Sequence, residues 1–63
     1  ESEKMLVKFK KQYTHYLENN KEFNFEVGYW YQCKLISSLY CVTSIDGKIE
    51  IVLNEEQQKK YLE

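Results

Sequence analysis

The chain has 63 residues, nine lysines, no arginine and a formal net charge of −1. This length suits one small domain, and a hydrophobic content of 43% argues against disorder. No apolar run approaches the ~20 residues that span a bilayer, and the lack of arginine weakens an interpretation as a nucleic-acid binder. We therefore predict a single domain over residues 1–63 that does not enter a membrane.

The segment from about Ser2 to Asn20 has two interpretations. On a helical projection its apolar residues fall within one arc of ~120°, which favours an amphipathic helix. Those residues are Met5, Leu6, Phe9, Tyr13, Tyr16 and Leu17. Ser2 would be the N-cap of this helix, and Asn19 with Asn20 would end it. The alternative is a strand over residues 5–9, but its alternation breaks at Lys11, so we favour the helix.

Between Phe23 and Leu35 every odd-numbered residue is apolar. Side chains alternate between the two faces of a strand, so this pattern predicts one long strand with one buried face. Gly28 would be a bend within it. The first part of the strand, Phe23–Val27, would extend beyond its hairpin partner and form an unpaired edge.

Two further strands are predicted, from Leu39 to Ile45 and from Lys48 to Leu53, with turns at Ser37–Ser38 and Asp46–Gly47. With these turns, Leu35 lies opposite Tyr40 and Cys33 opposite Val42. One face then collects Tyr31, Cys33, Leu35, Tyr40, Val42, Ile49, Ile51 and Leu53. A slip of one residue would expose this whole set, so the two turns support each other.

The tetrapeptide Asn54-Glu55-Glu56-Gln57 is typical of a capping box and predicts a short helix that runs to Leu62. The predicted fold class is α+β, with an N-terminal amphipathic helix packed on a three-stranded antiparallel meander and a short C-terminal helix. The alternative is a small all-β barrel of the Src-homology-3-like type.

The prediction of an all-β barrel depends on a resemblance to known families. The pattern Phe25-Glu26-Val27-Gly28 with Trp30-Tyr31 and Asp46-Gly47 resembles strands of Src-homology-3-like and Tudor-like barrels, which implies a strand in the N-terminal segment. The order helix, three strands, helix is also similar to that of the double-stranded-RNA-binding domain. That family begins its last helix with a Gly-rich, Lys-rich stretch, whereas this chain has Asn54-Glu55-Glu56-Gln57. Neither resemblance carries functional residues to this chain.

The residues that could carry chemistry are few. Cys33 and Cys41 fall on opposite faces of the predicted hairpin and are not expected to form a disulfide. His15 is the only histidine and is expected on the solvent side of the first helix. Two cysteines and one distant histidine do not give the ligand set of a structural zinc. We expect no catalytic residue, metal or cofactor, and favour a cytoplasmic protein, with secretion left open.

The predicted register also gives the sheet an opposite face with large apolar residues. They are Trp30, Ile36, Leu39, Ile45 and Val52, and a face this apolar is typical of a contact site. Alternatively, the C-terminal segment covers the face or the sheet curls into a barrel. Our hypothesis is a non-enzymatic protein-binding module, such as an inhibitor, immunity or phage-type accessory protein, centred on Trp30.

Two other functions compete with this hypothesis. One is weak nucleic-acid binding through Lys8, Lys10 and Lys11 together with nearby tyrosines. The absence of arginine argues against it. The other is a structural homodimer, in which the apolar face or the Phe23–Val27 edge contacts a second copy of the chain.

Overall fold

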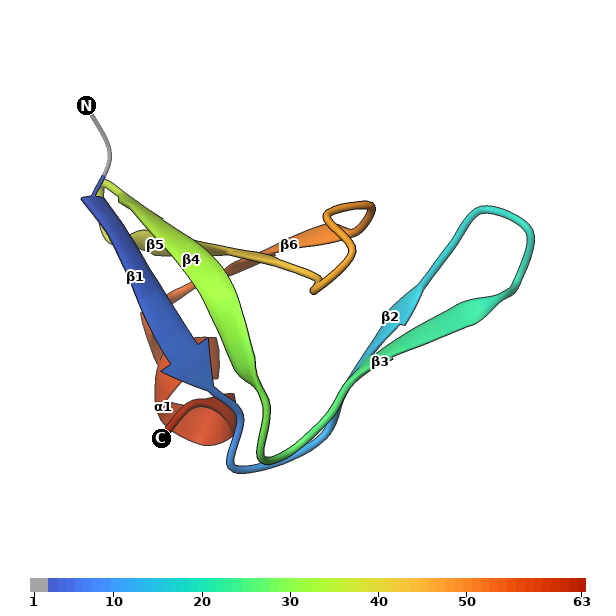
Figure 1. The fold of residues 1–63 in the computed structure, drawn as a ribbon, viewed down its shortest axis with the longest axis horizontal. Coiled ribbons are helices and arrows are strands. Elements are labelled where there is room, and N and C mark those ends of the chain that lie inside the picture. The colour runs from blue at the N-terminus through green and yellow to red at the C-terminus, as the bar shows by residue number, and fades with distance from the viewer. Residues whose placement is uncertain (1–2) are drawn as a thin grey trace.

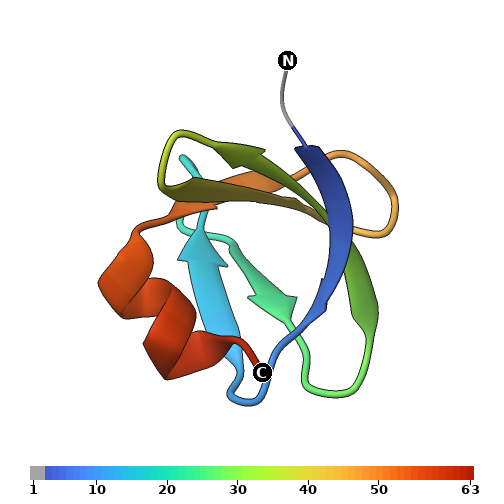
Figure 2. The same cartoon turned by 90° about the vertical axis from the view of Figure 1, so that its left-hand side faces the viewer.

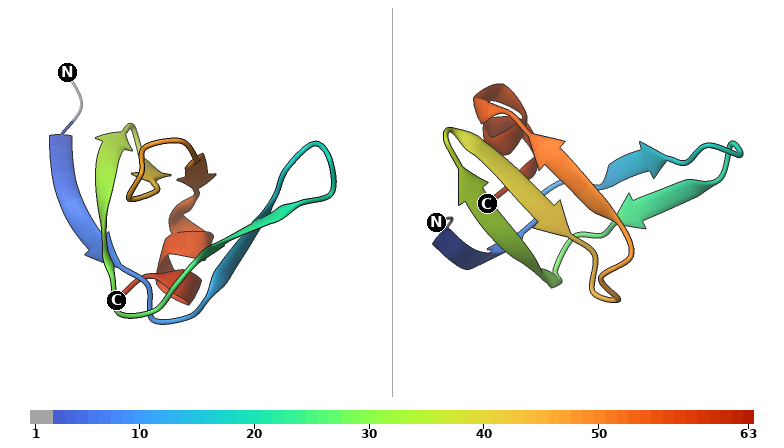
Figure 3. Two further views of the ribbon diagram at one scale, coloured as in Figure 1. Left: turned by 45° about the vertical axis from the view of Figure 1, so that its right-hand side comes forward. Right: turned by 90° about the horizontal axis from the view of Figure 1, so that it is seen from above.

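The computed structural model describes residues 3–63 and is mostly β, with one short helix near its end (Figure 1). In chain order the elements are β1 (Glu3–Lys8), β2 (Tyr13–Tyr16), β3 (Glu22–Phe25), β4 (Trp30–Ile36), β5 (Leu39–Thr43), β6 (Glu50–Leu53) and α1 (Glu55–Tyr61). A four-stranded antiparallel sheet has the order β1-β4-β5-β6, and β2 pairs only with β3. The β2–β3 pair projects away from the larger sheet (Figures 1 and 3).

The predicted N-terminal helix is wrong, and with it the predicted α+β fold class. Residues 3–8 and 13–16 are strands, and the predicted N-cap, Ser2, lies outside the described residues. The apolar positions that fit one helical arc also fit two short strands separated by a bend. The interruption at Lys11, which counted against a strand, is the connection between β1 and β2. The pairing of β1 with β4 and of β2 with β3 decides the conformation here, because tertiary context overrides a weak local preference.

Both strand pairs belong to one long hairpin that starts with β1 and ends with β4. From the pair Val7–Tyr31 to the pair Tyr13–Phe25, the register advances by six residues on each strand. The hairpin tip has a backbone bond from the Leu17 N–H to the Lys21 carbonyl (2.8 Å), and Asn20 has a φ of 64°. This is a three-residue loop with its last residue in the left-handed region, a conformation that asparagine tolerates. Asn20 therefore ends a hairpin loop and not a helix.

The long strand predicted from Phe23 to Leu35 is interrupted at its middle. Its two halves are β3 and β4, which belong to different sheets, and Gly28 between them has a φ of +94°. Glycine adopts this conformation without a steric penalty because it has no Cβ. The predicted unpaired edge at Phe23–Val27 is also wrong, because β3 is paired with β2 along its whole length.

Aromatic rings hold the bend against the larger sheet. Phe9, Phe25 and Tyr31 are buried, and their ring centroids lie 5.0–5.5 Å apart. The Glu26 N–H donates a hydrogen bond to the Tyr31 hydroxyl oxygen (2.9 Å), which satisfies a backbone donor where the ladder is interrupted. We call the cluster of Phe9, Phe25 and Tyr31 the aromatic joint.

The predicted meander is confirmed in its register. Leu35 lies opposite Tyr40, Cys33 opposite Val42, and Val42 opposite Ile51. The turn at Ser37–Ser38 is confirmed as well, and Ser37 has a φ of 55°. A positive φ at the first of two turn residues is typical of tight hairpin turns.

The connection from β5 to β6 is longer than the predicted two-residue turn. The strands stop at Thr43 and resume at Glu50, while a backbone bond from the Ser44 N–H to the Ile49 carbonyl (2.8 Å) keeps the register. The Asp46 carboxylate accepts hydrogen bonds from the Ser44 hydroxyl (2.6 Å) and from the Lys48 N–H (3.0 Å). These bonds replace ladder bonds in the connection and fix its shape.

The predicted capping box is confirmed at the start of α1. The Asn54 side chain accepts from the Gln57 N–H (2.9 Å), and the Gln57 side chain accepts from the Asn54 N–H (3.0 Å). After the helix the chain returns to the end of β1, where Leu62 pairs with Phe9 and is buried (Figure 2). The core consists of Phe9, Phe25, Tyr31, Cys33, Val42, Ile51, Leu53 and Leu62.

Candidate functional site

The five residues predicted to form a contact site are all exposed in the structure. The exposed fractions range from 39% for Leu39 to 72% for Ile45, and Trp30 is 57% exposed. Except for Ile45, which lies in the β5–β6 connection, they are on the strands of the larger sheet, on the side away from the core. We call this side the outer face. Its strand residues are Lys4, Leu6, Lys8, Trp30, Gln32, Lys34, Ile36, Leu39, Cys41, Thr43, Glu50 and Val52.

Helix α1 does not cover the outer face. Leu62 belongs to the buried core, and Tyr61 packs against that core and stacks edge-on to Tyr13, with ring centroids 5.0 Å apart. The C-terminal segment therefore closes the inner side of the sheet. The alternative in which the C-terminal segment covers the outer face is wrong.

Strand β1 adds three outer-face residues that the sequence interpretation missed. Lys4, Leu6 and Lys8 lie opposite Lys34, Gln32 and Trp30, respectively, and Leu6 is 58% exposed. The alternation of residues 4–8 indicates them, because it is typical of a strand. A helical interpretation of this segment does not place Lys8 beside Trp30.

The four predicted site residues that lie on strands separate into two regions. Ile36 pairs directly with Leu39, and Val52 lies opposite Cys41, next along β5 on the same face. We call the four side chains Ile36, Leu39, Cys41 and Val52 the apolar corner. Trp30 lies at the other end of β4, and the row of polar side chains Gln32, Thr43 and Glu50 separates it from this corner.

Trp30 has a charged neighbour. The Lys8 ammonium nitrogen lies 4.8 Å from the centroid of the Trp30 ring, on the strand opposite it. This cation–π contact orients an exposed aromatic side chain and leaves more than half of its surface accessible. An oriented, accessible tryptophan is well suited to contact another macromolecule, because little side-chain entropy remains to be lost on binding.

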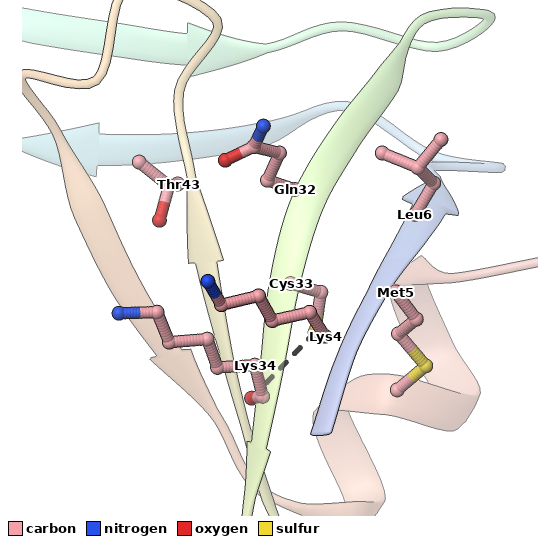
Figure 4. Close-up of a pocket in the computed structure, with 7 residues that line it drawn as sticks. All are labelled: Lys4, Met5, Leu6, Gln32, Cys33, Lys34 and Thr43. Carbon is pink, nitrogen blue, oxygen red and sulfur yellow. Dashed lines mark hydrogen bonds between the residues drawn. The ribbon is translucent and has the colours of Figure 1, made fainter. Parts of the chain in front are cut away.

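The outer face is basic on the side of β1 and β4. The side chains of Lys4 and Lys34 extend in the same direction across the sheet, beside Gln32 and Thr43 (Figure 4). These residues line a shallow groove of about 470 Å³. Among the outer-face residues given above, Glu50 on β6 is the only acid. Anionic groups are therefore attracted toward the β1 side of this face.

Potential metal-binding side chains do not cluster within residues 3–63. No group of three or more His, Cys, Asp and Glu side chains is close enough there to hold a metal ion. His15 lies in β2 opposite Phe23, half-buried, and not on a helix. In the same range, no helix has the length and apolar character needed to cross a membrane.

The two cysteines lie on opposite faces, as predicted, and both are thiols. Cys33 belongs to the buried core, whereas Cys41 is half-buried on the outer face. Burial, with a smaller contribution from the charge of Cys41, raises the pKa of the Cys33 thiol to about 11. Cys33 is therefore unreactive at neutral pH, because the thiolate is the nucleophile.

The chain matches no model of a known protein family, no curated protein and no solved structure at a significant level. The residues of the candidate site are therefore assigned from their positions in this structure alone.

Proposed function

We propose that this protein is a non-enzymatic protein-binding module whose outer face contacts another protein. The observation that supports this function most is the exposure of Trp30 on an outer face that α1 leaves open. Inhibitors, immunity proteins and phage-type accessory proteins act in this way, by contact alone. We place the function of this chain in that class.

The composition and rigidity of the outer face support the proposal. Tryptophan is among the residues most enriched at binding hot spots, and hot spots are surrounded by residues that exclude water. The apolar corner, with Ile36 and Val52 each about half exposed, adds a second anchor on the same sheet. Because both anchors are carried by paired strands, their spacing is fixed before a partner arrives.

The test compares Trp30→Ala with a matched control, Tyr29→Ala. The two aromatic side chains are adjacent in the chain and similarly exposed, at 57% and 55%, but Tyr29 is outside the outer face. A partner recovered with the wild-type chain and identified is titrated against both variants. We expect Trp30→Ala to weaken binding by about 2 kcal/mol or more, with the fold retained by circular dichroism, and Tyr29→Ala to bind normally. Equal effects of the two variants, or unfolding of Trp30→Ala, would contradict the proposal.

The lysines at the end of β1 and in the connection that follows it support a second candidate function, weak binding of single-stranded nucleic acid. Lys8 lies over the Trp30 ring, and Lys10 and Lys11 are exposed in the connection after β1. Proteins of that class combine a positive groove with an aromatic side chain on which bases stack. Binding of an oligo-dT strand would then weaken steeply as salt increases. No binding at low salt, or binding that ignores salt, removes this candidate.

A further inference from the structure

The backbone of β1 has one edge that β4 does not use. The Lys8 carbonyl accepts a hydrogen bond from the Glu63 N–H (3.0 Å), on the side opposite to β4. The N–H and C=O of one strand residue point to the same side, and the side alternates from residue to residue. The backbone groups of Lys4 and Leu6 therefore point to this outer edge, while those of Met5 and Val7 pair with β4.

The C-terminal segment already uses part of this edge as a strand would. Phe9 and Leu62 form an antiparallel bridge, and the Lys10 N–H donates to the Tyr61 carbonyl (2.8 Å). These contacts cover residues 8–10 only. Next to them, no partner strand is present for Lys4 and Leu6 among residues 3–63. The edge thus accepts a strand at one end and is open at the other.

A groove of about 700 Å³ follows this edge, and its lining is mainly apolar and basic. Met5, Val7 and Tyr40 are apolar and partly buried against the core, so they provide an apolar floor. Lysines line the rim, with Lys8, Lys10 and Lys59 in the groove and Lys4 on the outer face beside it. Glu63 is the acidic residue in the lining.

We propose that the β1 edge binds an extended acidic segment of a partner protein by β-strand addition. The inference rests on the proposed protein-binding function and names the partner's chemistry. On the added strand, one set of alternate side chains lies over the apolar floor and the other set lies beside the lysines. The preferred segment therefore alternates apolar and acidic residues. Its backbone pairs with the N–H and C=O groups of Lys4 and Leu6.

The other edge of the sheet shows why β1 is the docking edge. The bond between Ser44 and Ile49 shows that the backbone groups of Ile49 point toward β5. Because the side alternates from residue to residue, those of Glu50 and Val52 in β6 both point away from β5. That edge carries an acid in place of the lysines of β1 and would repel an acidic strand. The β6 edge thus provides a matched control within the same molecule.

The experiment uses two synthetic peptides of identical composition. One is the alternating hexapeptide Glu-Val-Glu-Val-Glu-Val, and the other is the block sequence Glu-Glu-Glu-Val-Val-Val, both capped at their ends. Binding is followed by the backbone amide signals of Lys4 and Leu6 in NMR spectra of the labelled full chain. We expect the alternating peptide to bind at least tenfold more tightly than the block peptide and to slow hydrogen exchange at the Leu6 amide.

Two edge variants separate strand addition from simple charge attraction. Leu6→Pro removes an N–H that points away from β4, and Glu50→Pro, outside the apolar corner, removes the corresponding N–H at the β6 edge. We expect at least tenfold weaker binding of the alternating peptide by Leu6→Pro and no weakening by Glu50→Pro. If Leu6→Pro does not fold, a synthetic chain with an N-methylated Leu6 removes the same donor without the proline ring.

Several results would overturn the inference. Equal affinity for the two peptides, or signal changes at β6 in place of β1, would rule out pattern-specific strand addition at this edge. If an oligo-dT strand binds and Leu6→Pro leaves its affinity unchanged while Lys4→Glu abolishes it, the edge is a phosphate-binding surface. If a partner protein binds through Trp30 while the alternating peptide fails, the inference fails and the proposed function stands. A partner lost in neither Trp30→Ala nor Leu6→Pro would overturn both.

Discussion

The two faces of β4 carry similar residues that differ strongly in burial. On the inner face, Tyr31 and Cys33 are buried to within a few per cent, and Tyr31 belongs to the aromatic joint. On the outer face of the same strand, Trp30 and Ile36 are about half exposed, at 57% and 48%. Burial of an aromatic side chain removes ~150–250 Å² from water. The aromatic joint therefore contributes far more to folding than the half-exposed Trp30 and Ile36 do. The inner face determines the fold, and the outer face contributes little to it.

The largest effect is expected at the aromatic joint. Phe25 is fully buried and its ring lies 5.0–5.4 Å from those of Phe9, Phe23 and Tyr31. Phe25→Ala should cost about 3–5 kcal/mol of the free energy of unfolding, which is enough to unfold most domains of this size. Urea unfolding measures the loss, with Phe23→Ala as a half-buried control of smaller effect. A loss below about 1 kcal/mol for Phe25→Ala would show that the joint is not the centre of the core.

A smaller loss is expected where the long hairpin bends. An added Cβ at Gly28 meets no atom within 4 Å, so a substitution there tests only the backbone conformation, with its φ of +94°. Gly28→Ala should destabilise the fold by about 1–3 kcal/mol, because L residues rarely adopt this region. D-alanine at the same position of a synthetic chain should be tolerated. Equal loss for both enantiomers would mean that the side chain, and not the backbone, is the cause.

The β5–β6 connection gives a pH-dependent contribution. Hydrogen bonds from the Ser44 hydroxyl and the Lys48 N–H hold the pKa of Asp46 below its usual value. Because the folded-state pKa is depressed, this stabilisation is complete above the unfolded pKa of about 3.9 and is lost as the pH falls through the folded value. The difference in Tm between wild type and Asp46→Asn should therefore shrink below about pH 4. A difference that stays constant with pH would contradict this account.

A still smaller effect is expected on the outer face. Trp30→Ala removes a half-exposed ring and its contact with Lys8, so the free energy of unfolding should change by less than about 1 kcal/mol. The measurement is again urea unfolding, run beside Phe25→Ala. A loss as large as that of Phe25→Ala would show that Trp30 stabilises the fold as a core residue does, and would contradict the difference between the two faces.

The cysteines test the same contrast without changing stability. Cys41 on the outer face should react with iodoacetamide at about pH 8, whereas Cys33 should stay unmodified while the chain is folded. The reason is that Cys33 is buried and its pKa is raised to about 11. Mass spectrometry of the native chain should then show one modified thiol. Equal rates for the two thiols would indicate that the sheet opens easily.

The C-terminal half of the fold was predictable because its local signals agree with one another. The turn at Ser37–Ser38 fixes the register of the meander, and the capping box at Asn54 fixes where β6 ends and α1 begins. The N-terminal half was not, because residues 3–20 fit either a helix or two strands, and their pairing partners lie far along the chain. Only the contacts with β3 and β4 decide between these conformations. These contacts join residues far apart in the chain, so a local sequence pattern does not reveal them.

The candidate site was predicted in part for the same reason. Trp30, Ile36, Leu39, Ile45 and Val52 are exposed as expected, since four of them follow from the period-two pattern of strands whose register was right. Their separation into Trp30 and an apolar corner, and the addition of Lys4, Leu6 and Lys8, depend on β1 joining the sheet. The open β1 edge could not be predicted from a sequence interpretation that placed this segment in a helix.

We propose that the outer face binds a different protein and not a second copy of this chain. Light scattering on a size-exclusion column in reducing buffer measures the mass of the wild-type chain and of Trp30→Ala. We expect the mass of one chain, 7.7 kDa, for both. A wild-type mass of two chains that falls to one in Trp30→Ala would show that a second copy occupies this face, and would contradict the claim.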